Sequence, residues 1–473
     1  MNDITAIFAF LKYCLGYKRN MSRMIAGMDW QELYSFASKQ ALLGLSFEGI
    51  ERLGKEYSEE LRLNPIGREL LMTWMGKAQQ IRRQNMKVNA VASKLYSMLR
   101  EDGLRCCILK GQGNALIYPN AYSRNPGDID VWVNASRERI MEYAQKKFEL
   151  GDDIRLQHLE TSLDGVPVEL HFFPCTMNNP IYHARLQKWF RRNADLQCSH
   201  IVGLPDGAGD IAIPTTAFNV VYQLTHLYHH FFDEGIGMRQ IIDYYYVVCD
   251  FYKVYQNSSK ITPSLFFDKA SCTRQFESEL SLHSLASLFP LKGGSTSHPD
   301  PLTLRGEGGN RPTRCSEPLR SKDGGPKRSS PDCAGWDRLS IEGDNSAGST
   351  TVVTSYASTA LDVAQRELKY LGLWKFAEAV MYVLKEVLGL SEDKMIVPVD
   401  EKRGRLLLAE ILDGGNFGRH FSKYGGFTHQ SMGKKYFLKI WRNMHFVRYY
   451  PAEALCEPLF RTWHFFWRLK YKK

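Results

Sequence analysis

The chain has 473 residues, of which 44% are hydrophobic and 12% aromatic, so it can bury substantial cores and is not a largely disordered protein. Its net charge of +10 is concentrated near one end, because residues 431–473 hold ten Lys and Arg against only Glu453 and Glu457. No stretch approaches the roughly eighteen uninterrupted apolar residues that a membrane span needs, and the first residues do not read as a signal peptide.

The ten cysteines contain no Cys-x-x-Cys pair of the kind that points to a metal or redox motif. Cys106 and Cys107 fall in a predicted buried strand, where neighbouring side chains point to opposite faces. We therefore expect reduced thiols in the core of a cytoplasmic protein. The basic end of the chain adds the expectation of peripheral contact with a membrane.

Residues 1–100 are predicted to form an N-terminal helical region. In "DWQELYSFASKQALLGLSFEGIERL" (29–53), apolar side chains recur at intervals of three and four. A long helix is predicted from about Pro65 to Glu101, directly before the pattern of apolar residues changes.

Residues 101–213 carry the alternating pattern of strands and form the predicted catalytic core. Asp164-Gly165 marks a two-residue hairpin turn. The predicted elements are strands at 104–110 and 128–133, a helix at 137–148, and hairpin strands at 154–163 and 166–173. They predict an α+β fold, in which a small mixed sheet is flanked by N-terminal and C-terminal helical regions.

The second half of the chain is predicted to be helical, with one interruption. Residues 214–290 have helical periodicity with a break at 235–237, and the helical region continues over 351–430. Residues 291–350 contain ten Gly, six Pro and nine Ser without periodicity, so we expect a disordered insertion there. An ordinary long linker is the alternative. Residues 431–473 form a separate basic and aromatic tail.

Three interpretations of this tail are open. Its cations and aromatic residues suit a nucleic-acid surface, an amphipathic helix on an anionic membrane, or a helix that packs its aromatic side chains on the core. Because the aromatic residues recur at helical spacing, we favour core packing, with contact at a membrane surface next.

Two carboxylates stand out in "GDIDVWV" (127–133). Alternation along a strand puts Asp128 and Asp130 on one face and apolar side chains on the other. Such carboxylates repel each other unless a cation lies between them, and their hard oxygen atoms suit Mg²⁺ or Mn²⁺. A solvated strand end is the alternative. Glu169, flanked by apolar residues on another predicted strand, is a third carboxylate and favours the metal site.

A glycine-containing turn, Lys110-Gly111-Gln112-Gly113, follows the first predicted strand. Small residues there let backbone N–H groups approach phosphate oxygens. It is not a Walker P-loop, because G-x-x-x-x-G-K-[ST] is absent. Another glycine-rich stretch, 412–420, has no predicted strand before it, so a chain reversal explains it better than a phosphate loop.

The motifs "LKG" (109–111), "GDIDVWV" and "VELHF" (168–172) resemble the nucleotidyltransferase superfamily with the DNA polymerase β-type catalytic fold. The resemblance is strongest to an uncharacterised bacterial branch that carries an LKG turn before a DIDhhV strand. Helical segments on both sides of 291–350 also look like that branch. Gln112 stands where the turn normally has Gly or Ser, and the gap from the turn to Asp128 is longer than usual.

The resemblance implies an enzyme of the EC 2.7.7 type. It would move a nucleoside monophosphate from an NTP, with ATP as the first choice, to an unknown acceptor hydroxyl and release pyrophosphate. Asp128, Asp130 and Glu169 would be the catalytic residues and the ligands of Mg²⁺ or Mn²⁺. Nucleotide binding is expected of five further residues: Lys110, Gly111, Gln112, Arg124 and Arg239.

Two groups of residues, one around Arg239 and one of three histidines, have competing interpretations. Arg239 lies one helical turn before Asp243, so an intrahelical ion pair competes with a role in the cleft. His226, His229 and His230 share one helix face and raise the possibility of zinc. We favour polar residues that line a cleft or interface, because no nearby ligand completes a zinc site.

Two further histidines lie on the predicted hairpin. His171 shares the face of Glu169 and is expected to orient it or to contact the base. His158, on the partner strand, is expected to be structural.

Two other functions remain open from the sequence. One is a non-catalytic nucleotide-binding or membrane-associated module. The other is modification of a protein acceptor, as by the antitoxin-type adenylyltransferases of the same superfamily. The acceptor is therefore expected to be either a small molecule or a protein.

Overall fold

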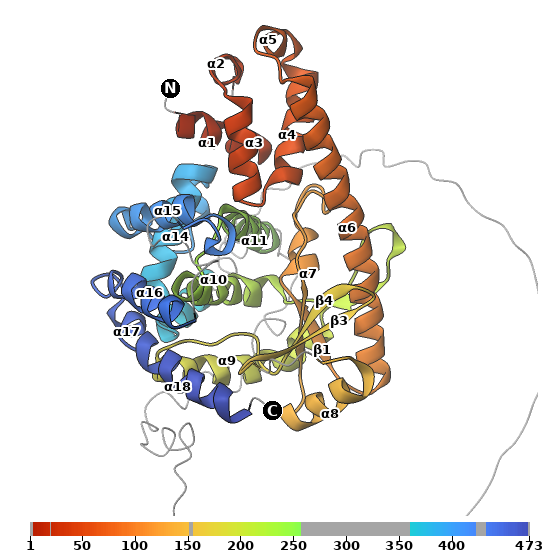
Figure 1. Cartoon of the computed structure of the whole chain (residues 1–473), viewed down its shortest axis with the longest axis vertical. Helices are drawn as coiled ribbons and strands as arrows, with labels where there is room; N and C mark the ends of the chain where they lie inside the picture. Colours follow the sequence, from red (N-terminus) through yellow and green to blue (C-terminus); the bar gives the residue numbers. More distant parts are fainter. Residues whose placement is uncertain (1–2, 19, 151–154, 257–359, 422–431, 472–473) are drawn as a thin grey trace, which may run out of the picture. The chain divides into compact units, whose positions relative to one another are not determined.

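A computed structural model describes residues 3–18, 20–150, 155–256, 360–421 and 432–471. The predicted insertion at 291–350 lies outside these residues. The described chain has a mixed α+β fold, in which a four-stranded sheet is preceded and followed by helices (Figure 1). The predicted fold class is confirmed.

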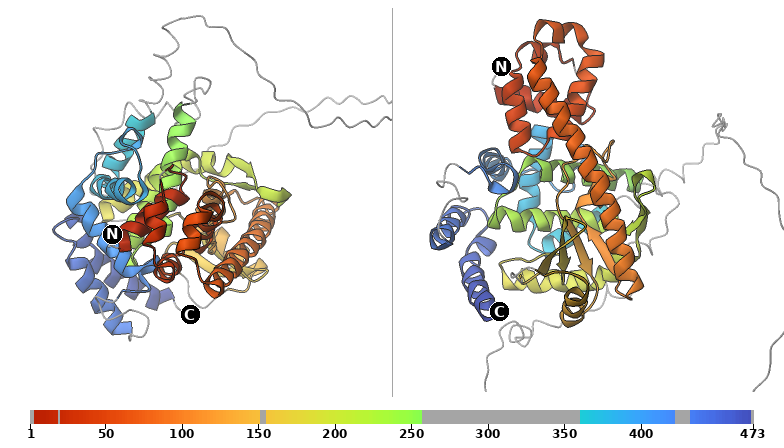
Figure 2. Two further views of the ribbon diagram at one scale, coloured as in Figure 1. Left: turned by 90° about the horizontal axis from the view of Figure 1, so that it is seen from above. Right: turned by 45° about the vertical axis from the view of Figure 1, so that its right-hand side comes forward.

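Helices occupy the described N-terminal region, as predicted. The longest, α6, begins after Gly67 and ends before Gly103, whose φ of +71° is the left-handed conformation that ends a helix. Figure 2 shows α6 running from the N-terminal helices along the sheet. The helices are α1 (Asp3–Cys14), α2 (Ser22–Ala26), α3 (Trp30–Lys39), α4 (Leu43–Glu56), α5 (Ser58–Leu63) and α6 (Arg68–Glu101).

The sheet has the strand order β1-β2-β4-β3. β2 pairs antiparallel with β1 and parallel with β4, while β3 and β4 form an antiparallel hairpin. Asp164 and Gly165 turn the hairpin with φ values of +50° and +71°, as a two-residue type I′ turn requires. The strands are β1 (Cys106–Leu109), β2 (Ile129–Val133), β3 (His158–Leu163) and β4 (Val166–His171).

The two faces of the sheet enter different cores. Val131 packs on one face with side chains of α6 and of α8 (Arg137–Lys147), whereas Trp132 points into the larger core that the helices form. Cys106 and Cys107 are divided between the same two cores, as predicted. Asp130 shares the face of Trp132, because side chains alternate along a strand.

The helices after the sheet bring distant segments to this second face. α10 (Thr216–Asp233) and α11 (Met238–Gln256) are separated at the predicted glycine break. Gly235 has a φ of +101°, and an added Cβ would lie 2.8 Å from the ring of Phe421. Three elements that follow β4 are not among the predicted ones: α9 (Pro180–Ser199), β5 (Ile201–Gly203) and β6 (Asp210–Ala212).

Two more helices, α14 (Trp374–Leu388) and α15 (Glu401–Gly414), continue the helical core. The chain reverses after α15 at Gly415 and Gly418, whose φ values are +63° and +61°. The stretch 412–420 is therefore a chain reversal with glycine in left-handed positions, as expected.

The tail consists of α16 (Met432–Met444), α17 (Pro451–Ala454) and α18 (Glu457–Tyr471). Phe446 and Tyr450, which lie between α16 and α17, are buried in the helical core, so the tail packs on the core at this segment. No helix in the described parts of the chain has the length and apolarity to cross a membrane. Other apolar side chains of the tail are exposed, namely Phe437, Trp441, Met444, Leu455, Leu459, Phe465 and Phe466.

Candidate active site

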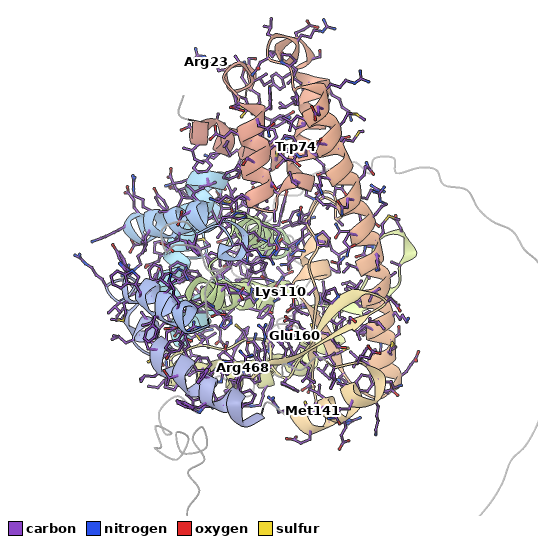
Figure 3. The ribbon with its side chains drawn as sticks, in the orientation of Figure 1. Arg23, Trp74, Lys110, Met141, Glu160 and Arg468 are labelled. Atoms are coloured by element: carbon purple, nitrogen blue, oxygen red, sulfur yellow. The ribbon has the colours of Figure 1, made fainter. Side chains whose placement is uncertain are left out.

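The site begins where β1 ends. Leu109 pairs with Asp130 across β1 and β2, and the next residue, Lys110, has the positive φ of +52° that only a minority of non-glycine residues adopt. This turn brings the Lys110 ammonium to 2.9 Å from Asp130 Oδ1. Figure 3 labels Lys110 between the strands and α10. The strained conformation thus positions a cation on a buried carboxylate.

The parallel register of β2 and β4 supplies the second carboxylate. Asp130 is paired with Glu169, so both side chains lie on the same face of neighbouring strands. His171 follows two residues after Glu169 on that face. Its Nε2 donates to Asp130 Oδ1 at 3.0 Å and to Glu169 Oε2 at 3.1 Å. His171 therefore orients Glu169, as one of its two sequence-based interpretations expected.

The charges in this cluster shift one another's protonation. Burial raises the pKa of Asp130, but Lys110 and His171 outweigh it and hold that pKa well below its usual range. Burial lowers the pKa of His171, whereas its bonds to Asp130 and Glu169 raise it, and the net result is about 9. Asp130 is thus held ionised and His171 protonated.

Asp128 lies just before β2, at the exposed rim of the site. The negative charge of Asp130, then withdrawal from water and the charge of Glu169, raise its pKa to about 6. Three carboxylates, Asp128, Asp130 and Glu169, thus lie near only two cations, Lys110 and His171.

Histidines of α10 border the site on its other side. His226 Nε2 lies 2.8 Å from Lys110 Nζ and 2.9 Å from His230 Nε2. Burial and the charge of Lys110 hold the pKa of His226 well below its usual value, so this imidazole is neutral. His229 lies 3.2 Å from the hydroxyl of Thr176. These three histidines line the site, which agrees with the favoured interpretation.

One group of three side chains in the described parts of the chain brings metal-binding atoms within 4.8 Å of one another: His158, Glu169 and His171. His158 Nδ1 is 3.2 Å from Glu169 Oε2. Burial, followed by the charges of His171 and Arg155, lowers the pKa of His158 to about 2. His158 is therefore a neutral imidazole beside Glu169 and His171, and its structural role stays a prediction.

The turn that carries Lys110 continues into α7 (Gly111–Ala115). Gly111 has a φ of +28°, so the backbone here favours glycine. Gln112 is buried, and its side-chain amide donates to Asn89 Oδ1 of α6. The side chain of Gln112 therefore points away from the carboxylates, which leaves only its backbone N–H for a phosphate.

The two predicted arginines take other partners in this structure. Arg124 Nε and Nη2 each donate to an oxygen of Asp243 at 2.8 Å, and both side chains are buried. Tyr118 also donates to Asp243. Arg239 donates to the carbonyl of Asn125 at 3.0 Å. Asp243 thus pairs with Arg124 rather than with Arg239 of its own helix, and both arginines hold the loop that leads to Asp128.

A pocket lies beside the histidines. Thr176 and His229 form part of its wall, together with Gln157 at the entry to β3. The C-terminal end of α10 and three side chains of α18, Phe460, Arg461 and His464, also line it. The pocket combines aromatic and hydrogen-bonding side chains, as binding sites for polar molecules do.

Residues 26–261 match the sequence profile of a protein family described as "Uncharacterised nucleotidyltransferase". The matched stretch includes β1 to β4, α7, α10 and α11, and therefore every residue of the site described above except those of the tail. No curated protein and no solved structure matches the chain.

Proposed function

We propose that the protein transfers a nucleoside monophosphate from an NTP to an acceptor hydroxyl and releases pyrophosphate, because residues 26–261 match the profile of a nucleotidyltransferase family. The observation that carries the proposal is the register pair of Asp130 and Glu169 on one sheet face, with Lys110 beside it. Carboxylates next to a cation at the end of a strand suit the transfer of a phosphoryl-type group.

Asp128, Asp130 and Glu169 would hold the Mg²⁺ or Mn²⁺ ions of this reaction. The residues fit that task, because one His171 nitrogen lies within 3.1 Å of both Asp130 and Glu169. Two carboxylates that share one N–H are close enough to share a cation. When bound, the ions neutralise phosphate charge and lower the pKa of the attacking hydroxyl.

Phosphate binding is proposed for the turn, whereas the two arginines have a different role. Lys110 Nζ, already placed at Asp130, would contact phosphate oxygens, and the backbone N–H groups of Gly111 and Gln112 would lie beside it. A direct contact from Arg124 or Arg239 would require each to leave its present partner. Arg124 and Arg239 would therefore position the loop that ends at Asp128.

We place the acceptor in the pocket between Thr176, His229 and α18. His229 is next in sequence to His230, and His230 contacts His226, which touches Lys110. The pocket is thus connected by direct contacts to the carboxylates. A small polar molecule suits its mixed lining better than an apolar one.

The test is transfer of label from α-³²P-labelled NTPs. Purified protein, Mg²⁺ or Mn²⁺ and one NTP at a time are incubated with a small-molecule extract or a protein extract of the cells that express the chain. We expect labelled non-nucleotide product and pyrophosphate, with ATP as the best donor. Label on protein bands instead would favour the protein-modifying alternative, and NTP binding without pyrophosphate release would favour a non-catalytic module.

The tail favours a second proposal, that the protein docks on an anionic membrane surface. Trp441 of α16 is 63% exposed and Phe466 of α18 is also 63% exposed. The exposed cations Lys434, Arg448 and Arg468 lie on the same helices or the loop between them. Exposed aromatic side chains beside cations are the composition of interfacial helices.

We expect the protein to float with vesicles of phosphatidylglycerol and phosphatidylcholine, and not with pure phosphatidylcholine. Replacing Trp441 and Phe466 by Ser should reduce the bound fraction at least about fivefold, since both supply buried apolar area at the interface. Leu63→Ser is the matched control, because Leu63 is 87% exposed but lies on α5. Equal flotation of both variants, or binding to nucleic acid alone, would contradict the proposal.

A further inference from the structure

His158 is a buried polar side chain that the proposed reaction does not use. It is 2% exposed, and neither of its ring nitrogens makes a hydrogen bond to any described residue. Buried polar atoms normally have a hydrogen-bond partner or a metal ion. Nδ1 lies 3.2 Å from Glu169 Oε2 and Nε2 lies 3.7 Å from Glu160 Oε1, without hydrogen-bond geometry, so a metal ion beside the ring would supply the partner that the ring lacks.

The neighbours of His158 have the right atoms at suitable distances. His158 Nδ1 and His171 Nε2 lie 3.2 Å and 3.1 Å from the same oxygen of Glu169. A tetrahedral ion with bonds of about 2.0–2.2 Å places its ligand atoms about 3.3–3.5 Å apart. Small side-chain adjustments, with release of the His171 Nε2 proton to solvent, would thus bring the three atoms to one ion.

The hairpin holds these side chains in place. His158 is paired directly with His171 across β3 and β4, and their ring centres are 4.9 Å apart. Glu169 lies two residues from His171 and so shares its face of the hairpin. Three donors on two paired strands form a site with little freedom to rearrange.

We propose that His158, Glu169 and His171 form a transition-metal site that takes Zn²⁺ or Mn²⁺ in preference to Mg²⁺. Two imidazole nitrogens and one carboxylate oxygen suit the borderline ion Zn²⁺, and Mn²⁺ accepts imidazole ligands more readily than Mg²⁺, which prefers a shell of oxygen atoms. A set of two histidines and one glutamate that leaves one position open is also the ligand set of catalytic zinc sites. Metal binding at this site does not require an NTP.

The site borders the carboxylates of the proposed reaction, since His171 also contacts Asp130. One ion of the reaction would then be held partly by imidazole. That consequence rests on the proposed function, whereas the metal site rests only on the three side chains.

The experiment is to bind Mn²⁺ to the metal-free, full-length protein without nucleotide and to record electron spin-echo envelope modulation. We expect modulation from ¹⁴N of two imidazoles, and a Zn²⁺ affinity by calorimetry at least about 100-fold tighter than that for Mg²⁺. His158→Gln should remove one of the two nitrogen signals and weaken Zn²⁺ binding at least about tenfold. His445→Gln, an exposed histidine on the tail, should change neither signal nor affinity.

A wild-type spectrum without ¹⁴N modulation would overturn the proposal even if the His158 variant failed to fold. Equal affinity for Mg²⁺ and Zn²⁺ would also overturn it. Label transfer from NTP is measured separately. Imidazole-bound Mn²⁺ without label transfer would support the metal site and contradict the proposed function. Label transfer without a ¹⁴N signal would support the proposed function and contradict the metal site.

Discussion

Replacement of Asp130 by Asn is expected to lower label transfer from NTP about 10³-fold or more while the protein stays folded. Asp130 is the buried carboxylate that contacts both Lys110 and His171. A neutral amide there would weaken cation binding between Asp130 and Glu169, and such charge stabilisation contributes several kcal/mol to phosphoryl-type reactions. The measurement is the rate of pyrophosphate release at saturating NTP.

The fold should tolerate this change, because Asp128 and Glu169 still balance the charges of Lys110 and His171. Cooperative thermal unfolding and an unchanged far-ultraviolet circular dichroism spectrum would show that the Asp130→Asn protein is folded. Asp164→Asn is the matched control, since Asp164 lies at the hairpin turn with its side chain 49% exposed. An Asp130→Asn protein with wild-type activity would refute the assignment of the site.

Replacement of Asp243 by Ala is expected to lower the free energy of unfolding by about 3–5 kcal/mol, as when one partner of a buried ion pair is removed. Arg124 makes two hydrogen bonds to Asp243 and is 4% exposed, so the variant would leave a guanidinium group buried without its carboxylate. The hydroxyl of Tyr118 would lose the same acceptor. Urea unfolding followed by circular dichroism measures the loss.

The control for this prediction is the exposed ion pair of Arg105 with Asp195, whose side chains are 53% and 77% exposed. Asp195→Ala should cost no more than about 1 kcal/mol, because solvent screens such pairs. The double change of Arg124 to Met and Asp243 to Leu should recover part of the loss, since it leaves no unpaired charge. If Asp243→Ala costs no more than Asp195→Ala, the pair does not stabilise the fold.

Much of the fold is predictable from the sequence because it depends on local patterns. The long helix α6, the strands β1 to β4 and the Asp164-Gly165 turn all lie where periodicity and turn residues predicted them. The short β5 and β6 were harder to predict. Each spans three residues, too few for alternation to show.

The position of His158 was also available from the sequence. In a hairpin with a two-residue turn, residues at equal distances from the turn are paired, so a turn at Asp164-Gly165 places His158 opposite His171. Counting from the turn would have brought His158 to the face of Glu169. Its proximity to Glu169 in space follows from that register.

The partners of the charged side chains could not be predicted in this way. Arg124 and Asp243 are separated by 119 residues, and Lys110 and His226 by 116. Sequence spacing identifies neighbours on one helix, such as Arg239 and Asp243, but says nothing about which loop a helix approaches. Because α11 packs against the loop before β2, Asp243 forms its ion pair with Arg124 instead.

The sequence by itself therefore predicted Asp128 and Asp130 on one strand and Glu169 on a second, and the structure has Asp130 on β2, Glu169 on β4 and Asp128 directly before β2. Strand alternation is a local property of the backbone, and it needs no knowledge of the rest of the fold. Only the tertiary structure decided which groups meet these carboxylates. Lys110 and His171 reach them because β1, β2 and β4 are paired, while Arg124 is held elsewhere because a buried charge stays with its nearest counter-charge.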